Sequence, residues 1–588
     1  MYYEETNGFI PQAGEETNAE ELLARLDKKS EWNVPQIDLS KYRTYYFDAE
    51  KGDDKNDGRS EKTPKRSVAA IAQAAKTCKK YAGVRLLLKR NAVFEGDLVL
   101  GDFEADEKYP LIVSAYGDGE KRPVIVGKEC TLRLTAGNAR ICDLEITGKE
   151  ALQGIYVTPA KCGAMKNIVI ENCYVHDINF DWIYETKACD TDPDTIDIEK
   201  VCPEYEADGK TYSRYHFRNH GGIILLNATT ENEGASWLEN VYILDNTVEN
   251  VARTGITVYS RWSDKAGVGY GFNKFVDDTD AFNAPERSIG YYVHKNVVCV
   301  GNTVVCAGGD AIVLSSVDTC ILEHNVSYYA NYLGRVGYWN AAIWVFNVKD
   351  ALFRYNEAAY TYMRYGSEDA QGYDLDNACR NVLFRYNYAH HNEGGGLLMC
   401  NNKTVVKRHT AEGELIGEPQ KEMGAWYNNL VCDNVFVYNG NPKNPLRSAF
   451  ITIAREVDWV WLWRNTVVLR DDIENQSVVN TEDVGRYCRN HFYEKNLFYA
   501  PSPVNARLTD EMILKRTYEG NLYYNVGEEF PKAAKDENAV SGVDPKIEIP
   551  ADFRGYEKIT AFAARNSFAK IAGARLDPES KKSDNPNK

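Results

Sequence analysis

The feature that most constrains the fold is a sequence motif that recurs from about residue 128 onward. Each copy contains two or three apolar residues, a spacer, an asparagine and a short alternating strand. The asparagines stand at positions 172, 246, 302, 325, 356, 387, 434, 465, 496 and 521. From Asn302 onward their separations are 23, 31, 31, 47, 31, 31 and 25 residues, as expected for one coil plus variable loops. Short strands at this period, with no helices between them, predict an all-β parallel solenoid.

A β-sandwich is the main alternative for a chain of many short strands. It would need hairpin turns, and Asn-Gly or Asp-Gly pairs between strands are scarce here. The solenoid is therefore favoured. One asparagine per coil predicts a left-handed turn residue whose side chain bonds the asparagine of the next coil.

These patterns divide the chain into four predicted segments. Residues 1–45 form an extension with one short helix capped by Asn18, and residues 46–127 form a small α/β cap whose helix opens at Thr63-Pro64. Residues 128–530 form the solenoid, and residues 531–588 form a C-terminal cap and a disordered tail. Three insertions, about 178–218, 263–288 and 402–423, are expected on one face, as loops at a binding face often are.

Composition excludes several classes of function. The formal net charge of -17 argues against nucleic acid, and no apolar run is long enough to span a bilayer. The N-terminus lacks the pattern of a secretion signal, and the 14 cysteines have no metal-like spacing, so we expect a cytoplasmic protein with reduced thiols. The 39 tyrosines and 10 tryptophans would suit sugar stacking, and a tyrosine-rich flank could support a homo-oligomer.

The densest cluster of acidic residues that falls in a regular strand pattern, rather than simply being solvated, lies between Ser367 and Cys400. Two short strands, Gly372–Asp376 and Gly396–Cys400, begin 24 residues apart, about one coil, so they are expected side by side. Because side chains alternate along a strand, Tyr373 and Leu375 would face the core. Asp374 and Asp376 would then both face outward, about 6–7 Å apart.

Two further acids occupy equivalent positions in these coils. Asp369 and Glu393 each lie three residues before the glycine that opens the strand, and stacking would place them about 5 Å apart. Glycoside cleavage needs one carboxylic acid to protonate the leaving oxygen and one carboxylate as nucleophile or base. Asp369, Asp374, Asp376 and Glu393 are therefore the candidate catalytic residues. The alternative is that they are solvated acids of an acidic protein.

Other side chains near this cluster are candidates for binding sugar. His390 and His391 precede Glu393 and could bond hydroxyl groups, although loop histidines more often bond backbone carbonyls. Trp344 lies one coil before Asp374 at the same outward position. The remaining aromatic candidates are Tyr338, Trp339, Trp262 and Trp426.

Two groups of motifs resemble known proteins. Tyr45-Tyr-Phe-Asp, the loop Gly52–Gly58 and Thr63-Pro64 resemble the N-terminal cap of right-handed parallel β-helix proteins of the pectate-lyase-like superfamily. Gly372-Tyr-Asp-Leu-Asp and Tyr386-Asn-Tyr-Ala-His-His-Asn-Glu-Gly-Gly-Gly resemble β-helix glycoside hydrolases of the β-xylosidase and lacto-N-biosidase types. The resemblance covers about residues 45–575 for the fold and about 365–400 for activity.

The two types of enzyme imply different catalytic pairs. The lacto-N-biosidase type, with two aspartates seven residues apart, implies Asp369 and Asp376. The β-xylosidase type, with an Asp and a Glu one coil apart, implies Asp369 and Glu393. Asp369 belongs to the catalytic pair that each resemblance implies.

We therefore expect a right-handed parallel β-helix with an N-terminal α/β cap that hydrolyses glycosidic bonds in oligosaccharides without a cofactor. One alternative is a polysaccharide lyase or uronate epimerase, in which the acidic cluster holds Ca²⁺ and Arg364 and Arg385 are the nearby cations. Another is a carbohydrate-binding β-helix without catalytic activity. The fold hosts all three functions and does not choose between them.

Overall fold

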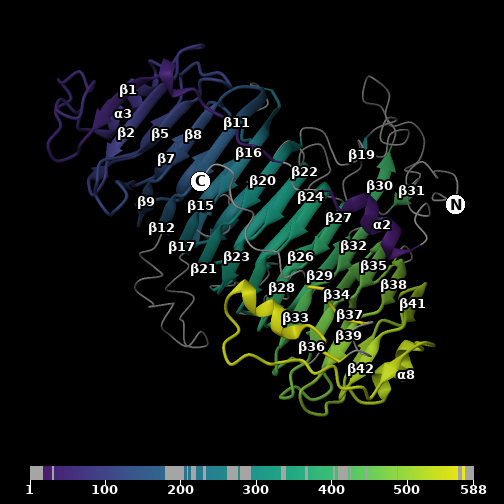
Figure 1. The fold of residues 1–588 in the computed structure, drawn as a ribbon. Coiled ribbons are helices and arrows are strands. Elements are labelled where there is room, and N and C mark those ends of the chain that lie inside the picture. Colours follow the sequence, from purple (N-terminus) through teal and green to yellow (C-terminus); the bar gives the residue numbers. More distant parts are fainter. Residues whose placement is uncertain are drawn as a thin grey trace.

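The structure is a computed structural model of the chain. It describes residues 18–28, 32–178, 204–207, 210–213, 220–229, 234–260, 276–277, 293–332, 340–363, 369–401, 404–407, 421–423, 426–444, 447–485, 488–566 and 572–576. The strands stack in parallel along one long axis, so the predicted parallel β-helix is confirmed (Figure 1).

Each complete coil contributes strands to three faces. The first face consists of β4 (Leu98–Leu100), β7 (Cys130–Leu134), β10 (Gln153–Val157), β15 (Gly221–Leu226), β18 (Thr254–Tyr259), β22 (Ile312–Glu323), β24 (Ile343–Arg354), β26 (Gln371–Leu375), β29 (Gly395–Asn401), β34 (Ile451–Arg455), β37 (Ser477–Glu482) and β40 (Arg507–Thr509).

The second face consists of β1 (Arg43–Phe47), β2 (Val84–Lys89), β5 (Leu111–Tyr116), β8 (Ala139–Cys142), β11 (Gly163–Glu171), β16 (Ser236–Leu244), β20 (His294–Val300), the later halves of β22 and β24, β27 (Arg380–Arg385), β32 (Asn429–Cys432), β35 (Asp458–Trp463), β38 (Arg489–Glu494) and β41 (Arg516–Glu519).

The third face consists of β3 (Val93–Glu95), β6 (Val124–Val126), β9 (Glu145–Gly148), β12 (Tyr174–Ile178), β17 (Thr247–Val251), β21 (Thr303–Ala307), β23 (Val326–Tyr328), β25 (Glu357–Ala359), β28 (Tyr388–His390), β33 (Val435–Val437), β36 (Thr466–Val468), β39 (Leu497–Tyr499), β42 (Leu522–Tyr524) and β43 (Val540–Ser541).

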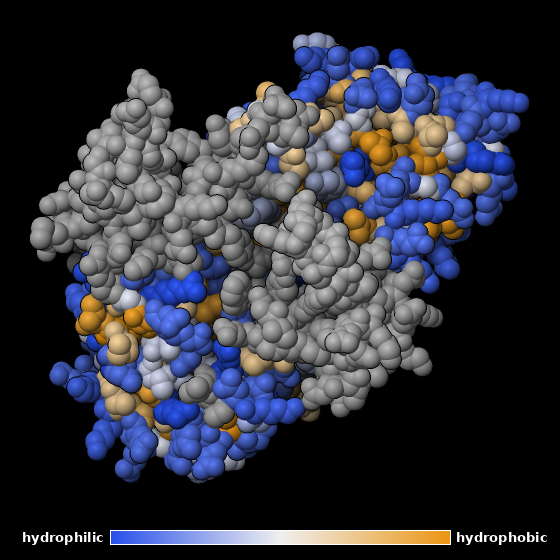
Figure 2. Space-filling view, turned by 180° about the vertical axis from the view of Figure 1, so that it is seen from behind, coloured by the Kyte–Doolittle hydropathy of each residue, from blue (hydrophilic) through white to orange (hydrophobic). Residues whose placement is uncertain are grey.

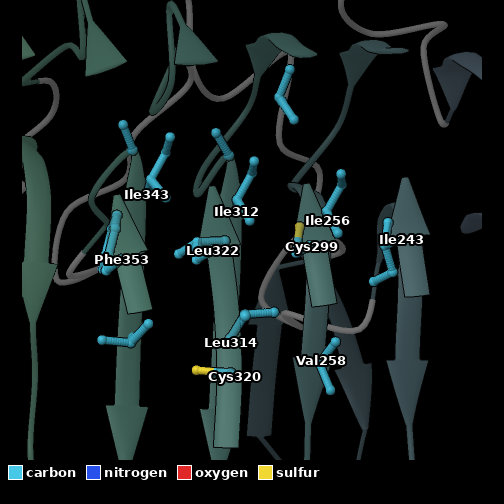
Figure 3. Close-up of a cluster of buried hydrophobic side chains, with 14 of the residues drawn as sticks. Ile243, Ile256, Val258, Cys299, Ile312, Leu314, Cys320, Leu322, Ile343 and Phe353 are labelled. Atoms are coloured by element: carbon cyan, nitrogen blue, oxygen red, sulfur yellow. The ribbon is translucent and has the colours of Figure 1, made fainter. Parts of the chain in front are cut away.

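The core is built from rows of inward side chains. Ile256 pairs with Ile312 and Ile312 with Ile343 on successive strands of the first face, and all three are fully buried. Figure 3 shows such residues from several coils, with Cys299 and Cys320 among the aliphatic side chains. Cysteine therefore serves here as a small hydrophobic residue, and all the cysteines that the structure describes are free.

A buried asparagine ladder joins the coils. From Asn302 onward, each Oδ1 accepts hydrogen bonds from the backbone N and the Nδ2 of the preceding asparagine. Each Nδ2 also donates to a carbonyl of an earlier strand, and the donor–acceptor distances at Asn387 are 2.8–3.1 Å. The ladder contains Asn246, Asn302, Asn325, Asn356, Asn387, Asn434, Asn465, Asn496 and Asn521. The predicted bonding between neighbouring asparagines is thus confirmed.

The predicted turn conformation is wrong by one residue. The left-handed residue is the one before the ladder asparagine, such as Tyr355 (φ 60°) and Tyr386 (φ 59°). Asn172 has φ 50° because it stands in that earlier position, and Cys173 takes the ladder place, its N–H donating to Asn246 Oδ1 at 3.0 Å.

The N-terminal extension packs on the second face. Helix α2 (Ala19–Leu26) has the predicted Asn18 cap, whose Oδ1 accepts from Glu21 N at 2.9 Å. The helix lies over Trp461 and Trp463, which share a buried cluster with it, beside β27, β32 and β35 in Figure 1.

The helix of the cap region begins later than the sequence indicates. Helix α3 (Val68–Ala75) is capped by Ser67, whose Oγ accepts from Ala70 N at 3.1 Å. Thr63 and Pro64 precede it in a turn, because Lys65 N donates instead to Tyr46 O at 2.9 Å. The strands of residues 46–127 stack in register with those that follow.

Two C-terminal segments have different roles. Helix α8 (Glu529–Ala534) closes the end of the core, where Phe530 packs on Phe498 and Tyr523. The segment after Val543 was expected to cap the same end, but it returns along the third face. There the 3-10 helix η5 (Tyr556–Phe562) and its neighbours pack on residues of β28, β33, β36, β39 and β42.

Parts of two insertions meet each other. Strand β19 (Val276–Asp277) pairs in parallel with β30 (Thr404–Lys407), which pairs with β31 (Lys421–Met423). The first insertion contains the hairpin β13 (Glu204–Ala207) and β14 (Lys210–Ser213). The tail from residue 577 lies outside the described residues.

Few large hydrophobic side chains of the described residues are exposed. In the view of Figure 2 hydrophilic side chains predominate at both ends, and hydrophobic ones gather in small groups. Within the described ranges, no helix has the length and apolarity needed to cross a membrane.

The asparagine ladder gives a direct stability prediction. Asn387→Ala removes the acceptor of Asn356 N and Nδ2 and the donor to Phe353 O, all buried. Orphaned buried groups of this kind cost about 1–3 kcal/mol each, so we expect a loss of about 3 kcal/mol in the free energy of unfolding, measured by urea denaturation. The exposed Asn538→Ala is the control and should change stability by less than about 0.5 kcal/mol. Equal effects of the two changes would contradict this role of the ladder.

Candidate active site

The two strands of the acidic cluster lie side by side as predicted. On the first face Asp374 of β26 stands between Trp344 of β24 and Leu398 of β29. Tyr373 and Leu375 are fully buried in the core, which leaves Asp374 on the outward side. Asp374 is nevertheless only 5% exposed, and Asp376, on the same side, is half-buried.

The backbone is kinked at Ala370, directly after Asp369. Ala370 has φ 74°, and its N and O bond Asn340 O at 2.8 Å and Gly394 N at 2.9 Å, in the coils before and after. The pKa of Asp369 is raised well above its usual range, first by burial and then by the negative charge of Asp376. Among the charged groups, Asp376 has the largest effect on this pKa.

Asp376 has a contrasting environment. Its Oδ1 accepts hydrogen bonds from the backbone N of Asn377 at 2.7 Å and from Asn377 Nδ2 at 2.5 Å. Donors of this kind stabilise a carboxylate rather than a neutral acid. One carboxyl group of the pair thus favours its protonated form, and the other is supported as an anion.

Glu393 makes hydrogen bonds that the expected stacking on Asp369 does not involve. Its coil stacks on that of Asp369, because Gly394 N donates to Ala370 O. The Glu393 carboxylate, however, accepts from Met363 N at 2.6 Å, and its own N–H donates to Thr361 O at 2.9 Å. Glu393 thus ties its coil to the one that precedes Asp369, and the leading charged neighbour of Asp369 is Asp376.

Two of the tryptophans predicted to bind sugar lie within the described residues, and their environments differ. Trp344 occupies the predicted outward row beside Asp374, but it is 3% exposed and its Nε1 donates to Asp310 Oδ1 at 2.9 Å. Asp310 is also paired with Arg253 at 3.0 Å. Trp426 is fully buried, and its Nε1 donates to Leu375 O at 3.1 Å. This corrects the expectation of a sugar platform at Trp426, which is a core residue.

The two histidines lie on another face. His390 belongs to β28 of the third face, is fully buried and contacts Glu357 Oε1 through Nε2 at 3.1 Å. The Nδ1 atoms of His391 and His390 lie 3.1 Å apart, and the ring of His391 packs on Phe553. Burial lowers the pKa of His391 to about 4. The carboxylate that His390 contacts is therefore that of Glu357 on the third face, and not one of the acidic cluster on the first face.

Three predicted aromatic residues, Tyr338, Trp339 and Trp262, lie outside the described residues. Within the described ranges no group of three or more His, Cys, Asp or Glu is arranged to hold a metal ion.

Sequence reasoning missed an ion pair beside these acids. Arg447 donates to Glu482 Oε1 at 3.2 Å, and both charges act on Asp369. Glu482 pairs with Ala454, which pairs with Cys400, so it stands in an outward row of the first face. The alternation of Val479, Asn480, Thr481 and Glu482 could have indicated this row. No periodic signal marks Arg447, because it lies in a turn.

The chain is similar in sequence to one type of glycosidase. It is 24% identical to a lacto-N-biosidase of Bifidobacterium longum subsp. longum over 85% of this chain and 31% of that protein. The chain thus spans about a third of the length of that relative. No family model matches the chain.

Solved structures support the fold. Two crystal structures of a lacto-N-biosidase of glycoside hydrolase family 136 from Eubacterium ramulus, a selenomethionine derivative and the native protein, superpose with TM-scores of 0.52 and 0.51. Each is 20% identical and covers 82% of this chain, with 67% and 68% of the other chain covered. The chain therefore shares its β-helix with these structures and is similar in sequence to a lacto-N-biosidase over most of its length.

Proposed function

We propose that the protein is a glycoside hydrolase of oligosaccharides, with Asp369 as the acid/base and Asp376 as the nucleophile or base. The observation that carries this proposal is the contrast between the two carboxyl groups. Burial and the charge of Asp376 raise the pKa of Asp369, while two N–H donors support Asp376 as an anion. Carboxyl groups whose environments separate their proton affinities are typical of glycosidases.

The reaction begins with proton transfer. Asp369 donates its proton to the glycosidic oxygen as the bond from this oxygen to the anomeric carbon breaks, so the leaving sugar departs as a neutral alcohol. Asp376 either attacks the anomeric carbon, forming an ester that water then hydrolyses, or takes a proton from the attacking water. In the first route the Asp369 carboxylate takes the proton from that water. Proton NMR of the first product distinguishes retention from inversion.

Similarity to lacto-N-biosidases supports oligosaccharides as substrates. Oligosaccharides that contain a lacto-N-biose unit are the first to test. We propose no cofactor, and hydrolysis should then persist in the presence of a chelator. Asp374 keeps its proposed assisting role, since its carboxyl group lies on the outward side of β26, two residues before Asp376.

A lyase or epimerase would need a cation near the substrate carboxylate. Arg385, one of the two cations expected to serve, is instead paired with Asp433 at 2.9 Å and with Asp27 at 2.8 Å. The other, Arg364, lies outside the described residues. A lyase would give products with an unsaturated end and no added water.

The proposed roles predict different effects of two isosteric substitutions. Asp369→Asn removes the acid, so kcat on a natural oligosaccharide should fall by about 10³-fold, with much of it retained on an aryl glycoside whose leaving group needs no proton. Asp376→Asn removes the nucleophile or base and should abolish cleavage of both substrates. Initial rates on the two substrates measure this contrast.

Glu393→Gln is the matched control, because glutamine keeps an oxygen that can accept from Met363 N. We expect kcat within about tenfold of wild type, since the change spares the proposed proton transfers. Near-complete loss on both substrates in Glu393→Gln, with Asp376→Asn still active, would assign the second carboxylate to Glu393 instead.

The raised pKa of Asp369 predicts how activity and stability depend on pH. The acid must be protonated, so kcat/KM should fall as pH rises through the pKa of Asp369 in the free enzyme. The folded state binds this proton more tightly than the unfolded state, so ionisation lowers stability as pH rises from about 4 through the raised value. Asp369→Asn should therefore unfold at a higher temperature than wild type near neutral pH and at the same temperature near pH 3.5. Calorimetry at both pH values checks this, and a constant difference would contradict it.

A further inference from the structure

The glycine run after Glu393 brings Asp369 close to a later coil. A Cβ at Gly394 would lie 2.0 Å from Asp369 O, and a Cβ at Gly395 would lie 2.8 Å from Ser448 O. The coil of Asp369, the glycine run and the coil of Ser448 are thus stacked in direct contact. Arg447 directly precedes Ser448, so it lies at the start of the coil that stacks on the glycine run. Counted back along the paired strands, Arg447 falls in the same row as Asp369 and two coils after it.

Arg447 is a nearly buried cation held by one carboxylate. It is 9% exposed, and its hydrogen bond to Glu482 Oε1 is 3.2 Å long. Asn480 Nδ2 donates to the same oxygen at 3.4 Å, which holds Glu482 in its row. The Nε atom of Arg447 is buried without a hydrogen-bond partner among the described residues. The ion pair therefore leaves part of the guanidinium charge available to a neighbour.

The charges that act on Asp369 come from four elements. Asp376 follows β26, Glu482 ends β37 and Asp310 precedes β22, and each of these carboxylates raises the pKa of Asp369. Arg447, in the turn before β34, is the cation in this set and lowers it. The charge of Asp310 is already balanced by Arg253 at 3.0 Å.

We infer that the ion pair of Arg447 and Glu482 is a positioning element of the proposed reaction, which sets the charge balance at Asp369. An acid/base that must give up a proton and take one back works best when its pKa is near the working pH. Burial and the charge of Asp376 both make Asp369 hold its proton more tightly. Arg447 offsets this effect, and Glu482 limits the offset by engaging the guanidinium.

The inference rests on the proposed function and predicts opposite shifts from two substitutions in the full chain. Arg447→Gln removes the cation, so the basic limb of the pH profile of kcat/KM should move up by about one pH unit. Glu482→Gln removes a carboxylate and frees Arg447, so the limb should move down by a similar amount. The Glu482 side chain is 42% exposed, so this variant should fold even if Arg447→Gln does not.

Arg470→Gln is the matched control. It also breaks an arginine–carboxylate pair, with Asp472 at 2.6 Å, but Arg470 is not among the charges that act on Asp369. The limb should not move in this variant. Loss of activity in Arg447→Gln or Glu482→Gln without a shift, or shifts in the same direction, would overturn the inference.

A second readout does not depend on hydrolysis. The infrared carbonyl band of protonated Asp369, identified by its loss in Asp369→Asn, should titrate at higher pH in Arg447→Gln and at lower pH in Glu482→Gln. If wild type hydrolyses no oligosaccharide, the proposed function fails, and the band still tests the charge balance. Unchanged titration in both variants would refute that balance even in an active enzyme.

Discussion

Stacking of coils in fixed register, held by the buried asparagine ladder, is the constraint on which the rest of the molecule depends. Each ladder residue satisfies backbone groups of neighbouring coils, for example Asn387, which bonds both Asn356 and the carbonyl of Phe353. A slip of one residue would orphan these groups and turn every core side chain outward. The same register places Asp374 between Trp344 and Leu398.

The site is a local departure from this regular scaffold. The outward positions of the first face that pair with or lie near this row include uncharged residues such as Thr257 and Leu398, whereas this coil carries Asp374 and Asp376 on its outward side. The kink at Ala370 and the glycine run after Glu393 then let Asp369 and the later coils approach closely. Burial and then the charges of neighbouring carboxylates raise the pKa of Asp369, and the proposed reaction uses that proton.

Periodicity predicted the features that depend on the main chain, but not the hydrogen bonds that side chains in turns make. The spacing of 24 residues and the alternation of Tyr373 and Leu375 placed the two strands and their faces correctly. The direction of the Glu393 carboxylate could not be predicted in this way, because a turn residue can bond any nearby backbone amide, here Met363 N. Trp426 follows a long insertion, so its inward position had no periodic signal, and the end of β28 at His390 placed that residue on the third face.

Cleavage of an oligosaccharide in water enriched in oxygen-18, followed by mass spectrometry of the products, tests the central claim most directly. If Asp369 and Asp376 hydrolyse a glycosidic bond, one product should carry a single oxygen-18 atom at its new reducing end, and neither Asp369→Asn nor Asp376→Asn should form it at the wild-type rate from a natural substrate. Products with an unsaturated end and no label, or labelled product formed undiminished by Asp376→Asn, would contradict the account.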